Sequence, residues 1–313
     1  MIPFVSPSSR QTLRLEGDFL VSPSGERFPV INGIPRFVPA ENYADAFGFQ
    51  WKNFARTQLD SHSGTPITRI RLERCLGFPI DQLRGKEVLE VGSGAGRFTE
   101  LLLSAGAQVH SVDLSNAVEV NRENMGADKV YQLAQASVYE LPFPPKSFDV
   151  VICLGVIQHT PSSERTIAAL YAMAKPGGLL VIDHYPWRIN YYFNPATWYR
   201  QVLKHLRPTT SKKIVDGMVN FFFPWHWRFR NSKTLTWLLK RVSPLITFMN
   251  VFPELSKVQQ EEWARLDTYD SLTDYYKHLR TPDQIRKTLE ALGGRELWVE
   301  RGGNGVEARC TVG

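Results

Sequence analysis

A glycine-rich turn between an apolar run and a helical segment is the feature that most constrains the fold of this chain. Residues 86–91 (KEVLEV) form the run, residues 92–96 (GSGAG) form the turn, and residues 98–107 space their apolar side chains as an α-helix does. Glycine lets the backbone turn sharply and come close to a ligand, and the first turn of a helix offers free N–H groups. The segment therefore predicts a strand, a ligand-binding turn and a helix.

Apolar runs continue to alternate with helical segments downstream of this turn. Runs of this kind are typical of a parallel sheet whose two faces are both covered by helices. Near the C-terminus, a helix predicted at 282–294 is followed by two apolar segments joined only by Gly302-Gly303-Asn304-Gly305, so these two form a hairpin. The predicted fold class is α/β, a doubly wound seven-stranded sheet that is mostly parallel and has an antiparallel last strand. Its strands are predicted at residues 86–91, 108–114, 129–135, 147–156, 178–185 and, as the hairpin, 296–312.

The remaining segments predict additions to this sheet. Residues 12–39 alternate short apolar pieces with turn signals such as Asn32-Gly33, which indicates a small β-hairpin appendage. Helical spacing at 43–56 and 66–76 predicts two helices before the first strand. The predicted organisation is a β-hairpin appendage at 1–40, a core with N-terminal capping helices at 41–185, a basic and aromatic helical lid insertion at 186–262, and the rest of the core at 263–313.

The composition of the 313-residue chain excludes several classes of protein. With 43% hydrophobic and 22% charged residues, the chain is neither disordered nor collagen-like. Its three cysteines are scattered without a C-x-x-C pair, which argues against a zinc cluster or a disulfide framework and fits a reducing compartment. No run reaches the ~18 apolar residues of a membrane span, and the first residues lack the pattern of a signal peptide. These observations predict a soluble, cytoplasmic protein.

The spacing of the glycine turn narrows the class of ligand. The turn reads G-x-G-x-G, whereas a dinucleotide-binding turn needs G-x-G-x-x-G, and here the bulky Arg97 holds the last position. A smaller nucleoside is therefore favoured. Asp113 closes the second strand 21 residues after Gly92, where an acidic side chain can hold both hydroxyls of a ribose. The alternative is that Asp113 caps the helix that begins near Asn116.

Four motifs in order resemble the class I S-adenosylmethionine-dependent methyltransferases. They are VLEVGSGAGRF, VDLS, ELPFPPKSFDVVICLGVIQHTP and AKPGGLLVI, which together cover about residues 86–185. The C-terminal hairpin is similar to the reversed last strand of that family. The flanking segments YADAFGFQWKNFARTQLDS and LDTYDSLTDYYKHLRTPDQI look like a subgroup of small-molecule and sugar methyltransferases.

This resemblance implies S-adenosylmethionine as the cofactor and assigns roles to individual positions. Glu90 and the glycines would line the methionine end of the cofactor, Asp113 would hold the ribose, and Leu114 would flank the adenine. Ser137 stands where the family usually has an aspartate that binds the adenine amino group, and a hydroxyl accepts that hydrogen bond without charge. The N-terminal hairpin resembles a small zinc-binding domain but lacks its cysteines, so no metal is expected. The candidate cofactor-binding residues are Glu90, Gly92, Ser93, Gly94, Gly96, Arg97, Asp113, Leu114, Ser137, Val138, Leu154 and Gly155.

Two histidines are candidate catalytic residues. A sulfonium methyl is already electrophilic, so the enzyme has to align a nucleophile and accept its proton. His159 follows the fourth strand and His184 follows the fifth, both at the carboxyl ends of strands, where open α/β sheets bind ligands. His184 has Asp183 beside it as a residue that could orient or charge it. The alternatives are a loop-stabilising role for His159 and a turn-capping role for Asp183.

The predicted insertion is basic and rich in aromatic residues. Residues 184–250 contain 11 Lys and Arg against one acid, whereas the whole chain carries a net charge of only +6. They also contain 15 aromatic residues, among them the run FFFPWHW at 221–227. Three roles fit this pattern: a lid over the acceptor, a peripheral contact with an anionic membrane surface, and binding of nucleic acid. Nucleic acid is disfavoured because no recognisable nucleic-acid-binding module accompanies the patch.

These observations predict an enzyme, an S-adenosylmethionine-dependent methyltransferase of biosynthesis. The expected acceptor is a hydroxyl of a small molecule or a sugar, on a lipid-linked or hydrophobic compound if the insertion contacts a membrane. The alternatives are a nucleic-acid or protein methyltransferase and, outside enzymes, a non-catalytic subunit that binds the cofactor.

Overall fold

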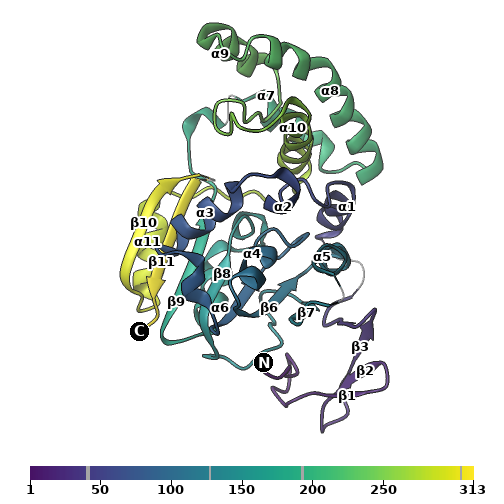
Figure 1. The fold of residues 1–313 in the computed structure, drawn as a ribbon, viewed down its shortest axis with the longest axis vertical. Coiled ribbons are helices and arrows are strands. Elements are labelled where there is room, and N and C mark those ends of the chain that lie inside the picture. Colours follow the sequence, from purple (N-terminus) through teal and green to yellow (C-terminus); the bar gives the residue numbers. More distant parts are fainter. Residues whose placement is uncertain (40–42, 127, 192–193, 304) are drawn as a thin grey trace.

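The computed structural model describes residues 1–39, 43–126, 128–191, 194–303 and 305–313. Its centre is a seven-stranded sheet with the order β10-β11-β9-β8-β5-β6-β7 (Figure 1). The strands β5 to β9 pair in parallel, whereas β11 is antiparallel to both of its neighbours, β9 and β10. The predicted fold class is therefore confirmed; Asn304 of the predicted hairpin turn lies outside the described residues. The strands are β5 (Glu87–Val91), β6 (Gln108–Asp113), β7 (Gln132–Gln135), β8 (Phe148–Cys153), β9 (Ala174–His184), β10 (Arg295–Gly302) and β11 (Gly305–Thr311).

Helices cover both faces of this sheet because the side chains of each buried strand alternate between two cores. In β5, Leu89 and Val91 belong to the core shared with one set of helices, and Val88 belongs to the core on the opposite face. The first set comprises α6 (Ser163–Tyr171) and α11 (Pro282–Ala291). The second set comprises α3 (Ile67–Leu76), α4 (Thr99–Ser104) and α5 (Ala117–Met125).

The N-terminal appendage is a four-stranded antiparallel sheet, where the sequence predicted a hairpin. Asn32 and Gly33, between its last two strands, have φ angles of 53° and 73°, which is the conformation that an Asn-Gly hairpin turn requires. The appendage is attached to the edge of the main sheet, since the amide of Phe37 donates to the carbonyl of Gln135 over 2.8 Å. Its strands are β1 (Arg14–Glu16), β2 (Phe19–Val21), β3 (Arg27–Ile31) and β4 (Ile34–Pro35).

The opposite end of the molecule is helical (Figure 1). Helices α7 (Pro195–Leu203), α8 (Pro208–Arg228) and α9 (Lys233–Val242) come from the predicted insertion, and α10 (Lys257–Thr273) crosses its predicted boundary at residue 262. Helices α7, α8 and α10 share a small core of their own, which includes Val219, Phe223 and Leu272. Two further helices, α1 (Asp45–Asn53) and α2 (Asp60–Ser63), lie between this end and the sheet. Within the described residues, no helix has the length and apolar character needed to cross a bilayer.

Candidate active site

A cavity of about 1030 Å³ lies where the carboxyl ends of β5, β6 and β8 meet the helical end of the molecule. Its walls come from the glycine turn, the end of β6, the loop after β8, helices α1, α3 and α10, and the segment 246–252. Ligands of open α/β sheets bind at this edge. The lining residues divide the cavity into two sides, one formed by the sheet and one formed by α10 and the segment 246–252.

The glycine turn needs glycine for two separate reasons. Gly92, Gly94 and Gly96 have φ angles of 79°, 51° and 96°, in the left-handed region that other residues avoid. A Cβ atom at Gly92 would also lie 2.2 Å from Cγ2 of Val156. Gly92, Ser93 and Gly94 line the cavity, whereas Gly96 packs behind the turn, where a Cβ atom would lie 2.9 Å from Cε of Met125.

Asp113 fixes the shape of this turn from the end of β6. Its Oδ2 accepts a hydrogen bond from the amide of Gly94 (2.8 Å), and its Oδ1 accepts from the amide and the hydroxyl of Ser115 (2.8 and 2.7 Å). Burial raises the pKa of Asp113 above its usual value, although the hydrogen bonds from Ser115 and Gly94 oppose that shift. Asp113 and Leu114 both line the cavity. The carboxylate thus both holds the turn and reaches the ligand space.

Glu90 lies behind the turn. Its Oε2 accepts from the hydroxyls of Thr99 (2.6 Å) and Ser111 (2.7 Å), and burial raises its pKa to about 7. It is not among the residues that line the cavity, so it would affect a ligand indirectly, by way of the glycine turn. Ser137 is similar, because its hydroxyl accepts from the amide of Tyr139 (3.2 Å) while its neighbours Ala136 and Val138 line the cavity.

Three buried polar atoms in the cavity wall have no hydrogen-bond partner in the described part of the chain. They are Oγ of Ser93, Nε of Arg71 and Nε1 of Trp263. Arg71, on α3, pairs with the carboxylate of Asp183, whose other oxygen accepts from the amide of Gly155 (2.6 Å). Buried groups of this kind normally have partners, so this region suits a polar ligand. Arg69, two residues earlier on α3, pairs with Glu73 and Asp81 instead.

Arg97 is held against the other end of α3. Its Nε donates to Oγ1 of Thr68 (3.0 Å) and its Nη1 donates to Oε1 of Gln58 (3.1 Å), and its guanidinium lies over the ring of Trp263. Burial, with a smaller contribution from the charge of Arg71, lowers the pKa of Arg97 to about 9. Arg97, Leu154 and Gly155 all line the cavity, as the resemblance implied for a ligand site.

His159 lies on the cavity wall, in the short 3-10 helix Ile157–His159. Its Nδ1 lies 3.2 Å from the carbonyl of Tyr276 and 3.2 Å from Oδ2 of Asp274, and its Nε2 lies 3.9 Å from Oδ2 of Asp270. Burial alone would lower the pKa of His159, but the charges of Asp270 and Asp274 outweigh that effect and raise it above its usual value. His159 is therefore an imidazole made more basic by two carboxylates.

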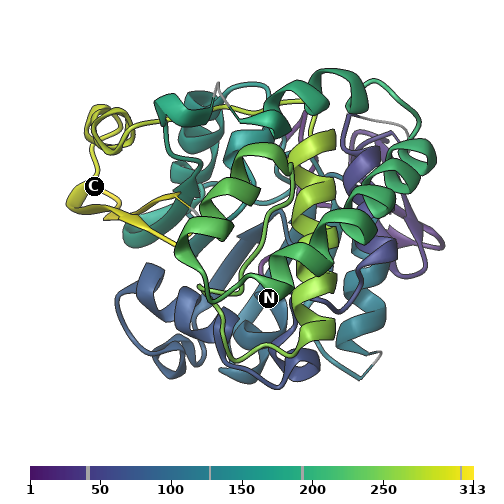
Figure 2. The ribbon, with the colours of Figure 1, turned by 90° about the horizontal axis from the view of Figure 1, so that it is seen from above.

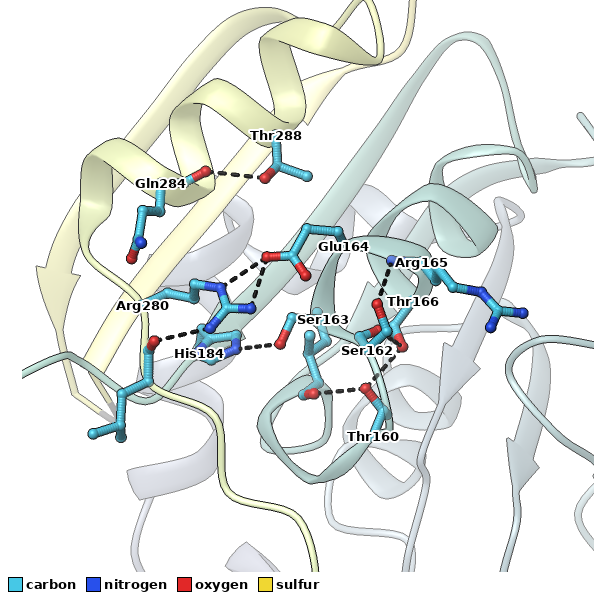
Figure 3. Close-up of polar contacts among 12 residues, drawn as sticks. Thr160, Ser162, Ser163, Glu164, Arg165, Thr166, His184, Arg280, Gln284 and Thr288 are labelled. Atoms are coloured by element: carbon cyan, nitrogen blue, oxygen red, sulfur yellow. Dashed lines mark hydrogen bonds and ion pairs between the residues drawn. The ribbon is translucent and has the colours of Figure 1, made fainter.

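His184 lies on the other face of the sheet. Successive residues of a strand point to opposite faces, so Asp183 reaches Arg71 on the cavity side while His184 points toward α6. Its Nε2 lies 2.9 Å from the hydroxyl of Ser163 (Figure 3). Its Nδ1 lies 3.0 Å from the carbonyl of Tyr185. Burial lowers the pKa of His184 to about 4, and it is not among the cavity-lining residues.

Three aspartates in and directly after α10 were not singled out from the sequence. Asp267 and Asp270 lie on one face of α10 and line the cavity, and Asp274 is the residue that caps the C-terminus of this helix. Asp274 is paired with Arg200 and Lys277, and Asp270 accepts from the hydroxyl of Tyr185 (3.2 Å). Burial raises the pKa of Asp267 to about 7. The spacing in LDTYDSLTD was the available signal, but nothing in the sequence said that this face turns toward the cavity.

The structure therefore brings ten of the fourteen candidate residues to one cavity. Those that line it are Gly92, Ser93, Gly94, Arg97, Asp113, Leu114, Val138, Leu154, Gly155 and His159. The four that do not are Glu90, Gly96, Ser137 and His184. Among the described residues, no group of three or more His, Cys, Asp or Glu is arranged to hold a metal ion.

Comparison with known proteins agrees with this geometry. Residues 89–182 match the family of methyltransferase domains. The ubiquinone biosynthesis O-methyltransferase of Azoarcus sp. strain BH72 is 41% identical over 100 residues, which are 31% of this chain and 42% of that protein. The protein of the same name from Pseudomonas entomophila strain L48 is 37% identical over 102 residues, 31% of this chain and 43% of the relative. The chain thus matches less than half the length of these curated relatives.

Two solved structures are similar over most of the chain. Magnesium protoporphyrin IX methyltransferase from Synechocystis PCC 6803, with bound SAH, has a TM-score of 0.44 at 16% identity, covering 86% of this chain and 94% of that one. Human N-acetylserotonin methyltransferase in complex with SAM has a TM-score of 0.44 at 14% identity, covering 88% of this chain and 60% of that one. The glycine turn and the acid that ends β6 both lie within the matched segment 89–182, so this part of the chain is a methyltransferase domain.

Proposed function

We propose that this protein transfers a methyl group from S-adenosylmethionine to a hydroxyl of a hydrophobic small molecule. The observation that carries the proposal is the single cavity, which joins the glycine turn and Asp113 on one side to His159 and an apolar wall on the other. The name of the partial relatives, ubiquinone biosynthesis O-methyltransferase, agrees with a hydroxyl acceptor and supports the choice.

The sheet side of the cavity suits the cofactor. The glycine turn and Arg71 would hold its methionine portion, because the amides of the turn and the unpartnered Nε of Arg71 are donors that suit a carboxylate. Asp113 would accept from the ribose hydroxyls, and Leu114 and Val138 would enclose the adenine. The cofactor supplies a methyl carbon that is already electrophilic, so the chain has to position the two reactants and accept one proton.

The side formed by α10 and the segment 246–252 suits an acceptor with a polar head and an apolar body. Aromatic and aliphatic side chains line much of it: Ile67, Ile70, Phe248, Val251, Phe252 and Trp263. His159, Asp267 and Asp270 supply the polar groups. An acceptor with a hydroxyl at its polar end and a hydrocarbon along the apolar wall would match both sets of side chains.

His159 is the proposed general base. The acceptor oxygen forms a bond to the methyl carbon, the bond between that carbon and sulfur breaks with its electrons remaining on sulfur, and the hydroxyl proton passes to Nε2 of His159. Asp274 and the carbonyl of Tyr276 hold Nδ1, which leaves Nε2 for this proton. Asp270 stabilises the imidazolium that forms. His184, held by Ser163 on the other face, is the alternative base on sequence grounds, and the experiment below separates the two.

The first experiment measures binding of S-adenosylmethionine and S-adenosylhomocysteine to the purified protein by calorimetry, with NAD as the control. We expect micromolar binding of both and no binding of NAD. Binding of neither would overturn the assignment of the cofactor.

The second experiment measures methyl transfer from labelled S-adenosylmethionine to phenols that carry short or long hydrocarbon tails, and to a matched sugar. We expect transfer to increase with tail length in the wild type and in His184→Gln, and to fall about 300-fold in His159→Gln although the cofactor still binds. Loss in His184→Gln with retention in His159→Gln would reverse the assignment of the base. Transfer to the sugar alone would overturn the hydrophobic acceptor.

A further inference from the structure

Helix α9 has an apolar face that is largely exposed in the part of the chain that the structure describes. The face consists of Leu235, Leu238, Leu239 and Val242, which follow the i, i+3, i+4, i+7 spacing of one helix side. Leu235, Leu238 and Val242 are 38%, 48% and 61% exposed, and α9 has no buried residue at all. A stripe of this kind normally packs against a core, so its exposure here is unusual.

Helix α8 adds exposed aromatic residues at the same end of the molecule. Its inner side, with Val215, Val219 and Phe223, is buried in the core shared with α10. On the opposite side Phe221 and Trp225, one turn apart, are more than half exposed. Figure 1 shows α8 and α9 at the end remote from the N-terminal sheet, and Figure 2 looks onto that end. We call Leu235, Leu238, Val242, Phe221 and Trp225 the docking surface.

The charged side chains of the stretch that carries the docking surface are all positive. Residues 217–253 contain no aspartate or glutamate. The cations of this stretch are Arg228, Arg230, Lys233, Lys240 and Arg241. In the part of the chain that the structure describes, none of the five lies within ion-pair distance of a carboxylate. Arg241 lies over the exposed ring of Trp237, 4.1 Å from its centroid. An occupant of this surface therefore has to be both apolar and anionic.

We propose that the docking surface binds the surface of an anionic lipid bilayer. A helix with an apolar stripe and cationic flanks lies in the interface between head groups and acyl chains, where the stripe is buried and the cations meet lipid phosphates. Each Lys or Arg near such a surface adds about 1 kcal/mol, equivalent to about fivefold in binding. Interfacial tryptophans such as Trp225 and Trp237 are enriched at this depth.

The chemistry of the surface distinguishes a bilayer from its competitors. A second copy of this chain would bring five further cations to the same place without a carboxylate to pair with them. Nucleic acid would use the cations but would leave Leu235, Leu238 and Val242 exposed, because bases stack on aromatic rings and not on leucine. An anionic bilayer satisfies the aliphatic stripe and the cations together.

The position of α9 also connects the docking surface to the cavity. The segment directly after α9 contributes Ile246, Phe248, Val251 and Phe252 to the apolar wall of the acceptor side. A hydrophobic acceptor could therefore pass from the bilayer to this wall without crossing the cofactor side. This last step rests on the proposed function, whereas the docking of α8 and α9 does not.

The test is co-sedimentation of the full chain with phosphatidylcholine vesicles that contain or lack phosphatidylglycerol, without cofactor or acceptor. We expect the wild type to sediment with the phosphatidylglycerol vesicles at low salt and to be released at high salt. The double variant Leu235→Asp/Leu238→Asp should bind at least about tenfold more weakly, because two apolar side chains no longer enter the interface. Lys240→Ser should bind about fivefold more weakly.

Leu15→Asp is the matched control, since Leu15 is 66% exposed on the N-terminal sheet at the other end of the molecule. It should bind vesicles like the wild type, and all variants should bind S-adenosylhomocysteine equally, which shows that they fold. Equal vesicle binding by the double variant and the wild type would overturn the proposal, as would equal binding to vesicles without phosphatidylglycerol. Absence of vesicle binding, with a dimer that the double variant dissociates, would assign the surface to self-association instead. Because no methyl transfer is measured, failure here leaves the proposed reaction to its own test.

Discussion

The two sides of the cavity are built differently. On the sheet side, Asp113 and the amide of Gly94 belong to neighbouring strand ends and complete each other's hydrogen bonds. On the opposite side, Asp267 and Asp270 come from a helix more than 150 residues further along the chain, and their charges meet Arg97 and His159 across long sequence separations. The first side is fixed by local backbone geometry, and the second by packing of the insertion. Changes to the first should therefore weaken cofactor binding, and changes to the second should alter turnover.

Gly92→Ala should have the largest effect. The new Cβ atom would lie 2.2 Å from Val156 in a backbone with φ of 79°, so the turn must deform. We expect affinity for S-adenosylhomocysteine, measured by calorimetry, to fall about a thousandfold, corresponding to ~4 kcal/mol. Gly64→Ala is the control, because its φ of 68° imposes the same backbone strain with no atom within 4 Å of the new carbon. If Gly64→Ala lowered the affinity as much as Gly92→Ala does, the backbone strain and not the close approach to Val156 would determine the effect.

His159→Gln tests the acceptor side. We expect kcat to fall about 300-fold, within the range of general base catalysis, while the dissociation constant of the cofactor stays unchanged. In the wild type, the base has to be neutral, so kcat should rise with pH through the pKa of His159, which two carboxylates hold above its usual value. The rising limb should therefore lie above pH 6.5. A pH profile with the same limb in His159→Gln would assign that limb to another group, with Asp267 the first to examine.

His184 provides a test of stability in place of turnover. Burial lowers its pKa from 6.5 to about 4, so the unfolded chain takes up a proton at a pH where the folded chain does not. The stabilising effect of neutral His184 is complete above pH 6.5 and decreases as the pH falls toward 4. We expect this one group to reduce the free energy of unfolding by roughly 2–3 kcal/mol over that interval. His184→Gln should be less sensitive to acid than the wild type in urea unfolding at pH 7 and pH 5; equal sensitivity would contradict the assigned environment.

Asp113→Asn should have a smaller effect on the sheet side. The amide keeps the size of the carboxylate but loses its charge and one of its two accepting groups, so it cannot receive hydrogen bonds from both Gly94 and Ser115. We expect affinity for the cofactor to fall about 20-fold, as for the loss of charge-assisted hydrogen bonds. Calorimetry at two salt concentrations would check it. An unchanged affinity would mean that Asp113 only shapes the helix cap, which is the alternative that the sequence left open.

The two sides also differ in how much of them the sequence could predict. The seven strands and the glycine turn were predictable because apolar runs and glycines act within a few residues of one another. Arg71 was missed because Arg69, two residues earlier in the same helix, looks equivalent in sequence, and only the packing of α3 decides which of them turns inward. His184 was favoured because Asp183 is its neighbour, yet adjacent residues of a strand point to opposite faces. The acidic face of α10 could be recognised as a face but not placed against His159.

Ser137→Asp should have the smallest effect, and it tests whether the sheet side is fixed by backbone or by side chains. The family resemblance suggests that an aspartate here would strengthen the contact with adenine. In this structure the Ser137 hydroxyl accepts from the amide of Tyr139, and the cavity wall at this point is formed by Ala136 and Val138. An aspartate would accept a hydrogen bond from the same amide, so we expect affinity for S-adenosylhomocysteine to change by no more than about twofold. A tenfold increase would mean that the side chain leaves Tyr139 for the ligand. The sheet side would then depend on a side-chain rearrangement as much as the acceptor side does.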